Sequence, residues 1–151
     1  MKVVFLDFDG VLNSELYVRN CGEYGVIIAP SRMQLLRQII DATRAQIVLS
    51  TSWREHWSKE EHELDSTGMR INEIFESYQL KVFDKTPKLG GRREKEIEAW
   101  LNEFPNVENF VVLDDRFLYA EFLKGHFVKT ANYLEGLDEE NVDLAIQILK
   151  S

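Results

Sequence analysis

The apolar residues of this chain gather in short continuous runs separated by polar segments. The longest runs lie within residues 3–6, 46–49 and 109–113, and they are rich in Val, Ile, Leu and Phe. Apolar runs without polar alternation are typical of strands buried on both faces of a parallel sheet. Shorter runs at 82–83 and 127–128 predict two further short strands.

Between these strands, apolar residues recur at helical spacing. Pro30 opens one predicted helix, whose apolar stripe is Met33, Leu35, Leu36, Ile39 and Ile40. Further helices are predicted over 54–66 (a very polar segment closed by Gly68), around 71–78, over 92–101, over 117–123 and after an N-cap at Asp138. Residues 13–29 have mixed polarity and two glycines, which indicates a loop or short irregular structure.

This alternation of strands and helices predicts an α/β fold, a three-layer sandwich with a mainly parallel, Rossmann-like central sheet. The chain has 151 residues, of which 44% are hydrophobic and 29% charged, as expected for one globular domain. It contains no repeat, low-complexity tract or linker, so we expect residues 1–151 to form a single domain.

The formal net charge is −8, and Cys21 is the single cysteine. One cysteine excludes an internal disulfide and a multi-cysteine metal site. An acidic chain needs a local basic patch to bind nucleic acid. Asp7 interrupts the N-terminal apolar run before it reaches signal-peptide length, and no run approaches a membrane span. We therefore expect a cytoplasmic protein that does not bind membranes.

Each long apolar run ends in residues that carry oxygen ligands. Asp7 and Asp9 follow the first run, Ser50 the second, and Asp114 and Asp115 the third. Because ligands bind at the carboxyl ends of parallel strands, we expect these side chains to share one crevice. Neighbouring carboxylates raise one another's pKa unless a cation offsets their charge, and Mg²⁺ prefers such ligands. A single acid here is more often a turn residue or N-cap, but the whole set favours a metal site.

The segment 5–13 has the sequence FLDFDGVLN. Its Asp-x-Asp-Gly pattern after a buried strand resembles the first motif of the haloacid dehalogenase-like (HAD) superfamily of phosphohydrolases. Ser50 resembles the second motif, and the pair Asp114 and Asp115 resembles the fourth; the likeness extends from Lys2 to about Leu149. Together with Ser-x-Ser-Trp-Arg and Ile-x-x-Trp-Leu, these motifs are most similar to stand-alone bacterial or phage proteins and to the phosphatase-like domains of RNA-repair proteins.

This resemblance implies an HAD-type fold and a Mg²⁺-dependent phosphatase that hydrolyses a phosphomonoester through an aspartyl-phosphate. Asp7 matches the nucleophile, and Asp9 matches the general acid and base. The resemblance implies that Mg²⁺ is bound by Asp7, by the backbone carbonyl of Asp9 and by Asp114. Asp115 is either a second ligand through water or an orienting residue.

The resemblance also assigns the phosphate-binding residues. Ser50 would hydrogen-bond the transferring phosphoryl group, with Thr51 and Ser52 as alternatives. Asp7 and Asp9 would point to opposite sides of an extended strand, so the chain must turn after Asp7. Gly10, counted here among the substrate-binding residues, tolerates the dihedral angles of such a turn.

The third family motif is a cation upstream of the fourth strand. Arg93 fits best by its spacing to the apolar face of its helix, with Lys95 and Lys88 as alternatives, although lysine is commoner than arginine at this position of the family. The segment Lys81 to Lys95 carries six bases and two acids. We expect it to bind an anionic polymer such as nucleic acid, helped by stacking or phosphate contacts from Trp53 and Arg54. Alternatively, the segment Lys81 to Lys95 is only a solvated loop, and Trp53 is a residue of the hydrophobic core.

Members of the family insert a cap domain at one of two positions, and at both positions the segment of this chain is too short for such a domain. Residues 13–29 are too short for a folded domain, and 55–85 suffice for a helix or two. We therefore expect no substantial cap domain and an open site that admits a nucleotide, a nucleic-acid end or a phosphoprotein. A receiver-like phosphoacceptor domain and a non-catalytic phosphate-binding module are the rival hypotheses. The order of the acids, with Asp-x-Asp-Gly first, disfavours the receiver.

Overall fold

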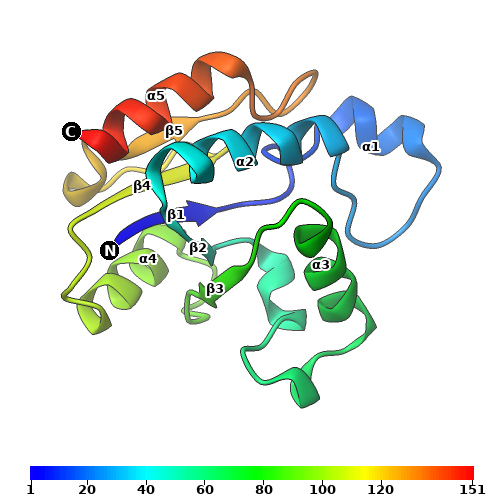
Figure 1. Ribbon diagram of the computed structural model, residues 1–151, viewed down its shortest axis with the longest axis horizontal. Coiled ribbons are helices and arrows are strands. Elements are labelled where there is room, and N and C mark those ends of the chain that lie inside the picture. Colours follow the sequence, from blue (N-terminus) through cyan, green and yellow to red (C-terminus); the bar gives the residue numbers. More distant parts are fainter.

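The computed structural model describes all 151 residues and is built around one five-stranded sheet whose strands are all parallel (Figure 1). The strand order is β3-β2-β1-β4-β5. The strands are β1 (Lys2–Leu6), β2 (Gln46–Leu49), β3 (Val82–Lys85), β4 (Asn109–Asp114) and β5 (Phe127–Lys129). All five predicted strands and the α/β fold class are thereby confirmed.

Five helices and three 3₁₀ turns connect the strands. The helices are α1 (Glu15–Cys21), α2 (Pro30–Thr43), α3 (Ser66–Ser77), α4 (Arg93–Glu103) and α5 (Glu139–Lys150). The 3₁₀ turns are η1 (Ser52–His56), η2 (Glu61–Glu63) and η3 (Glu121–Leu123). The helices predicted after Pro30, around 71–78, over 92–101 and after Asp138 are confirmed.

The sheet separates two hydrophobic clusters, which makes the fold three layers. Side chains alternate across a strand, so Val4 and Leu6 of β1 face the larger cluster, which contains apolar residues of α2, α3 and α5. Val3 and Phe5 face the smaller cluster with Ile97 and Trp100 of α4. In Figure 1, α2 and α5 lie side by side on one face of the sheet, and α4 covers the other.

Two predicted helices are wrong. The segment 54–66 forms only η1 and η2, because Trp57 is buried in the core with an extended backbone and Asp65 already caps α3. Gly68 lies in the first turn of α3 rather than closing a helix, and a Cβ there would meet the carbonyl oxygen of His56 at 2.0 Å. The segment 117–123 has an extended residue at Ala120 and keeps only the short turn η3.

No cap domain covers the sheet, as the sequence predicts. The segment between β1 and α2 holds a single seven-residue helix, α1. The segment between β2 and β3 contributes α3, whose Ile71 and Phe75 are buried in the core of the sandwich. Both segments therefore leave the carboxyl edge of the sheet without a second folded layer.

The N-terminus of α5 offers a test of the fold. The Asp138 side chain accepts a hydrogen bond from the Asn141 N–H, and the Asn141 side chain accepts one from the Asp138 N–H. Both hydrogen bonds of a capping box are therefore present. We expect Asp138→Ala to lower the free energy of unfolding by about 1 kcal/mol, measured by urea denaturation. Asp143→Ala, an exposed position on the same helix, is the control and should change stability less; equal losses would contradict the capping role.

Candidate active site

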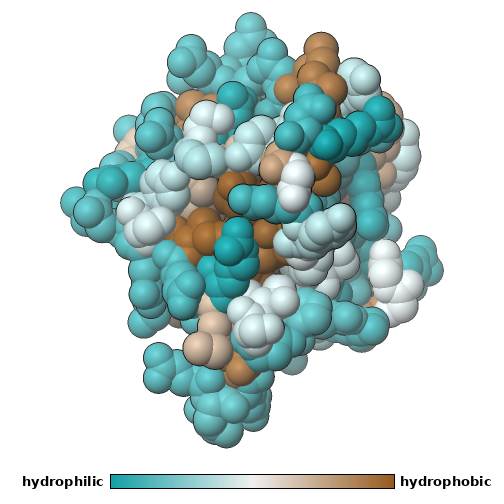
Figure 2. All heavy atoms as spheres, turned by 90° about the vertical axis from the view of Figure 1, so that its right-hand side faces the viewer, coloured by the Kyte–Doolittle hydropathy of each residue, from teal (hydrophilic) through white to brown (hydrophobic).

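The predicted acids meet at the carboxyl edge of the sheet, where the strand order reverses. β1 feeds β2 on one side and β4 lies on its other side, so the crevice between β1 and β4 is the switch point at which open α/β sheets bind ligands. Asp7 extends β1 here, with its N–H donating to the Leu113 carbonyl of β4. Figure 2 views this edge and shows hydrophobic side chains near its centre inside a mostly hydrophilic rim.

Arg93 connects the acids of the two strands. Its Nη1 lies 3.0 Å from Oδ2 of Asp7 and 2.7 Å from Oδ2 of Asp114. All three side chains are buried. The structure therefore brings Arg93, from the first turn of α4, to the position expected of the third-motif cation.

Burial and mutual repulsion shift the ionisation of these groups. Desolvation raises the pKa of Asp7 to about 7, with Arg93 opposing the shift and Asp114 and Asp115 adding to it. Desolvation also raises the pKa of Asp114, against the attraction of Arg93. For Arg93, desolvation lowers the pKa, but the two carboxylates outweigh it and the net shift is upward.

Asp115 completes a group of carboxylates that suits a metal ion. One oxygen each from Asp7, Asp114 and Asp115 lies within 4.8 Å of the others. Asp115 packs directly against Gly10, where a Cβ would come within 2.4 Å of Oδ2 of Asp115, and Gly10 has a φ of 83°. Only glycine fits here, because the turn needs a left-handed residue and the carboxylate fills the side-chain space.

Asp9 lies apart from the metal group and is held by two neutral donors. Asn13 Nδ2 donates to Oδ1 of Asp9 at 3.0 Å, and Trp53 Nε1 donates to Oδ2 at 2.9 Å. Asn13 also accepts from the Gly10 N–H and donates to the Ile27 carbonyl. These contacts fix the turn and orient the carboxylate that the sequence predicts to be the general acid and base.

The positioning role of Asn13 and the hydrogen bond of Trp53 to Asp9 were not predicted from the sequence. A local signal exists for Asn13, because asparagine three residues after the glycine of a turn commonly bonds the turn backbone. No local signal exists for Trp53, which is 44 residues from Asp9. Its indole is partly buried against the core, so it is neither a fully exposed stacking residue nor a simple core residue.

Ser50 is the one buried polar side-chain atom without a partner. Its Oγ is fully buried and makes no hydrogen bond. Leaving a hydroxyl unsatisfied costs about 1–3 kcal/mol, which favours a ligand that completes the bond. Of the two alternatives, Thr51 is buried and accepts from the Trp53 N–H as the N-cap of η1, whereas Ser52 is exposed.

The guanidinium of Arg54 is enclosed by protein acceptors, in contrast to the substrate contact predicted from the sequence. The guanidinium is buried and bonds the carbonyls of Thr51, Thr86 and Pro87. It also forms a buried ion pair with Glu96 of α4 at 2.8 Å. Because its nitrogens already have protein acceptors, Arg54 connects the turn after β2 to α4.

The basic segment Lys81 to Lys95 is dispersed by the fold. Arg93 enters the site, Lys85 donates to backbone carbonyls of Arg54 and Trp57, and Lys88 pairs with Glu55. Lys95 is exposed at the start of α4 and has no contact with the acids. The structure thus brings neither Lys88 nor Lys95 to Asp7, in contrast to Arg93.

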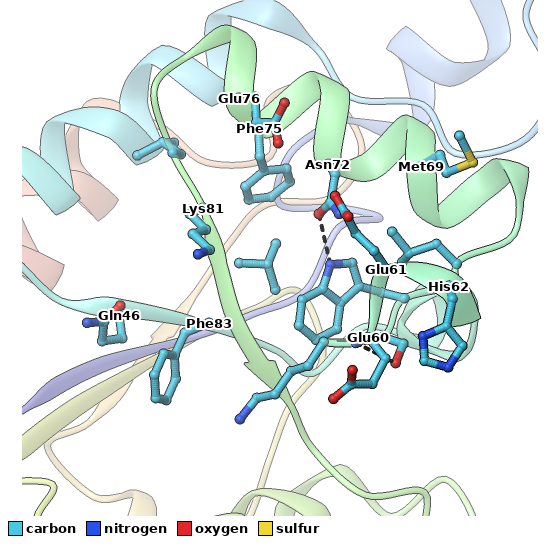
Figure 3. A pocket seen from close by; sticks show the side chains of 16 residues that line it. Gln46, Glu60, Glu61, His62, Met69, Asn72, Phe75, Glu76, Lys81 and Phe83 are labelled. Carbon is cyan, nitrogen blue, oxygen red and sulfur yellow. Dashed lines mark hydrogen bonds between the residues drawn. The ribbon is translucent and has the colours of Figure 1, made fainter.

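One large cavity lies away from the acids. It has a volume of about 1570 Å³ and lies between α3, the segment 57–64 and the start of β3. Figure 3 shows Phe75, Phe83 and Lys81 around it, together with the bond from the indole nitrogen of Trp57 to Asn72. None of the predicted site residues lines this cavity.

Comparisons with known proteins agree with the site. No helix has both the length and the apolarity needed to cross a membrane. No curated protein and no solved structure matches the chain. A family model described as the HAD domain in Swiss Army Knife RNA repair proteins matches residues 3–142, which includes every strand residue except Lys2 and every acid of the site. The chain therefore belongs to this family of HAD domains and, with it, to the HAD-type phosphohydrolases.

Proposed function

We propose that this protein is a Mg²⁺-dependent phosphatase that hydrolyses a phosphomonoester through an aspartyl-phosphate on Asp7. The observation that carries the proposal is the meeting of Asp7, Asp114 and Asp115, two of which, Asp7 and Asp114, contact the buried guanidinium of Arg93. A purely structural ion pair needs one acid for one arginine, whereas this site holds an excess of negative charge that a divalent cation would offset.

The donor set fits magnesium. Three carboxylates within 4.8 Å supply the hard oxygen ligands that Mg²⁺ prefers, and the family typically uses this ion. Asp7, Asp114 and Asp115 would hold it, with the carbonyl of Asp9 as the further ligand that the family resemblance implies. The ion, when bound, would offset the carboxylate charge and polarise the phosphoryl oxygens.

The chain's own residues supply the remaining steps. A carboxylate oxygen of Asp7 attacks phosphorus, the bond from phosphorus to the leaving oxygen breaks, and Asp9 gives that oxygen its proton. Asp9 then takes a proton from the water that attacks the phosphorus of the aspartyl-phosphate, which releases phosphate and restores Asp7. Ser50 Oγ donates to the phosphoryl group, and Arg93 offsets the charge on it.

The open edge of the sheet supports a substrate larger than a free sugar phosphate. We propose a nucleic-acid end or a nucleotide, with a phosphoprotein as the alternative for the same chemistry. Lys88 is paired with Glu55 and Lys85 is bonded internally. Lys81 precedes β3 and borders the cavity away from the acids. The exposed bases Arg92 and Lys95 are what remains of the predicted basic segment for docking a polyanion.

Activity separates the catalytic proposal from its rivals. We expect wild-type protein to hydrolyse para-nitrophenyl phosphate with Mg²⁺ and not with EDTA. Asp7→Asn should fall to the background rate, because an amide cannot attack phosphorus, and Asp9→Asn should lose about 10²–10⁴ in kcat with little change in KM. Equal turnover by wild type and Asp7→Asn would sink the proposal. A phosphorylated Asp7 that persists for hours would favour the receiver-like alternative.

Stability without metal tests the electrostatics of the site. The pKa of the Asp7 carboxyl is about 7 in the fold against 3.8 in an unfolded chain. The contribution of the protonated carboxyl to the stability of the fold is therefore fully present below about pH 4, and it is lost as the pH rises through 7. Asparagine cannot ionise, so in EDTA at pH 8 we expect Asp7→Asn to have the higher Tm, by roughly 5–10 °C. The two proteins should converge near pH 4.

Magnesium and a surface control complete that experiment. Adding Mg²⁺ at pH 8 should raise the Tm of wild type more than that of Asp7→Asn, because the ion binds the folded state through the carboxylate. Asp143→Asn, on the exposed face of α5, should follow wild type at every pH. A wild-type Tm in EDTA that stays equal to that of Asp7→Asn from pH 4 to 8 would contradict the buried repulsion.

A further inference from the structure

Two aromatic rings lie exposed immediately after the acids of β4. Phe117 is 68% exposed and Tyr119 is 83% exposed. Their rings are nearly parallel, with 14° between the planes and 6.2 Å between the centroids. Leu118, between them, packs against the smaller hydrophobic cluster, so the chain alternates in and out here and turns both aromatic rings toward solvent. We call Phe117 and Tyr119 the aromatic pair.

A cation accompanies the aromatic pair. Lys129 Nζ lies 4.5 Å from the centroid of the Phe117 ring, within the range of a cation–π contact. The surrounding segment 116–129 carries three bases and one acid, so its charge is +2 inside a chain whose net charge is −8. Flat rings with positive charge beside them are the combination that binds single-stranded nucleic acids, in which bases stack and phosphates meet cations.

The sheet places this surface next to the phosphate site. Phe117 is two residues from Asp115, which keeps their Cα atoms within about 7 Å. Lys129 is the register partner of Asp114 across β4 and β5, and the following residue, Thr130, donates to the Gly10 carbonyl. A terminal phosphate bound at Asp7 would therefore have its neighbouring nucleotides within reach of the aromatic pair.

We propose that the aromatic pair and Lys129 form a subsite that stacks one or two unpaired bases of a single-stranded nucleic acid whose terminal phosphate enters the active site. The subsite rests on the proposed phosphatase function for the fate of that phosphate, but base binding does not depend on hydrolysis. Leu118 and Tyr119 also border a cavity of about 480 Å³ with Leu123 and Phe127. A base stacked on Tyr119 thus has an apolar hollow beside it.

Binding to a catalytically inactive protein tests the subsite directly. The probes are a fluorescein-labelled single-stranded hexanucleotide without phosphate at either end and the same chain made abasic, and affinity is measured by anisotropy with Asp7→Asn protein. We expect Phe117→Leu with Tyr119→Leu to raise the Kd of the base-bearing probe by roughly tenfold to a hundredfold. The Kd of the abasic probe should not change, because leucine keeps the apolar surface and removes only the ring faces.

Two further variants serve as controls. Phe117→Trp with Tyr119→Trp keeps the ring faces and should restore the affinity for the base-bearing probe. Lys129→Gln should weaken binding of both probes and reduce the slope of log K against log salt by about one. Equal affinity of the parent protein for both probes, or an equal loss for both in the leucine variant, would overturn the subsite.

Turnover separates this inference from the proposed function. On phosphorylated hexanucleotides, with the phosphate at the 5′ or the 3′ end, the leucine variant should have a KM raised about tenfold or more, with its activity on para-nitrophenyl phosphate unchanged. Base-dependent binding without any hydrolysis would overturn the phosphatase and leave the subsite standing. Hydrolysis that does not depend on the nucleobases of the substrate would overturn the subsite and leave the phosphatase standing. An equal rise in KM of the leucine variant for phosphopeptides would do the same.

Discussion

The contact of one guanidinium with two carboxylates holds the active edge of this protein together. Arg93 reaches Asp7 on β1 and Asp114 on β4 with the same nitrogen, and it does so where the sheet reverses its order. Without this cation, two buried acids would face each other in a medium that screens poorly. Breaking a buried pair by removing one partner usually costs about 3–5 kcal/mol, because the remaining charge stays buried. The position of α4 is therefore an electrostatic requirement as well as a packing preference.

A second buried ion pair fixes the helix that carries this cation. Glu96 lies one turn after Arg93 on α4 and bonds Arg54, which follows the second strand. Glu96 also accepts from the Leu89 N–H, so the loop before α4 is tied to the same carboxylate. The fully buried hydroxyl of Ser50 lies four residues before Arg54 in this chain segment. The turn that we propose to bind phosphate and the helix that carries Arg93 are thus joined through Arg54 and Glu96, and a change at either residue would reach both.

The parts of this molecule that depend on local pattern were predictable. The strands follow from uninterrupted apolar runs, and Asp7, Asp114 and Asp115 follow from their place at the strand ends. The polar segment 54–66 was mistaken for a helix because its charged residues favour helices, whereas burial of Trp57 decides its conformation. The buried ion pair of Arg54 was not predictable, because its partner, Glu96, is 42 residues away. Interactions between distant residues leave no trace in a single sequence, and the bond from Trp53 to Asp9 is another example.

Charge balance connects the acidic chain to its proposed substrate. When ionised, Asp7, Asp114 and Asp115 together with Arg93 carry a net charge of −2, which one Mg²⁺ would neutralise. A bound phosphate then meets a nearly neutral centre, so its affinity must come from directed donors such as Ser50 and from contacts made by the rest of the substrate. The site has no cap that would supply such contacts. Exposed groups on the rim, among them the aromatic pair beside Lys129, are left to provide them. The proposed phosphatase would therefore gain its selectivity from what its substrate carries beyond the phosphate.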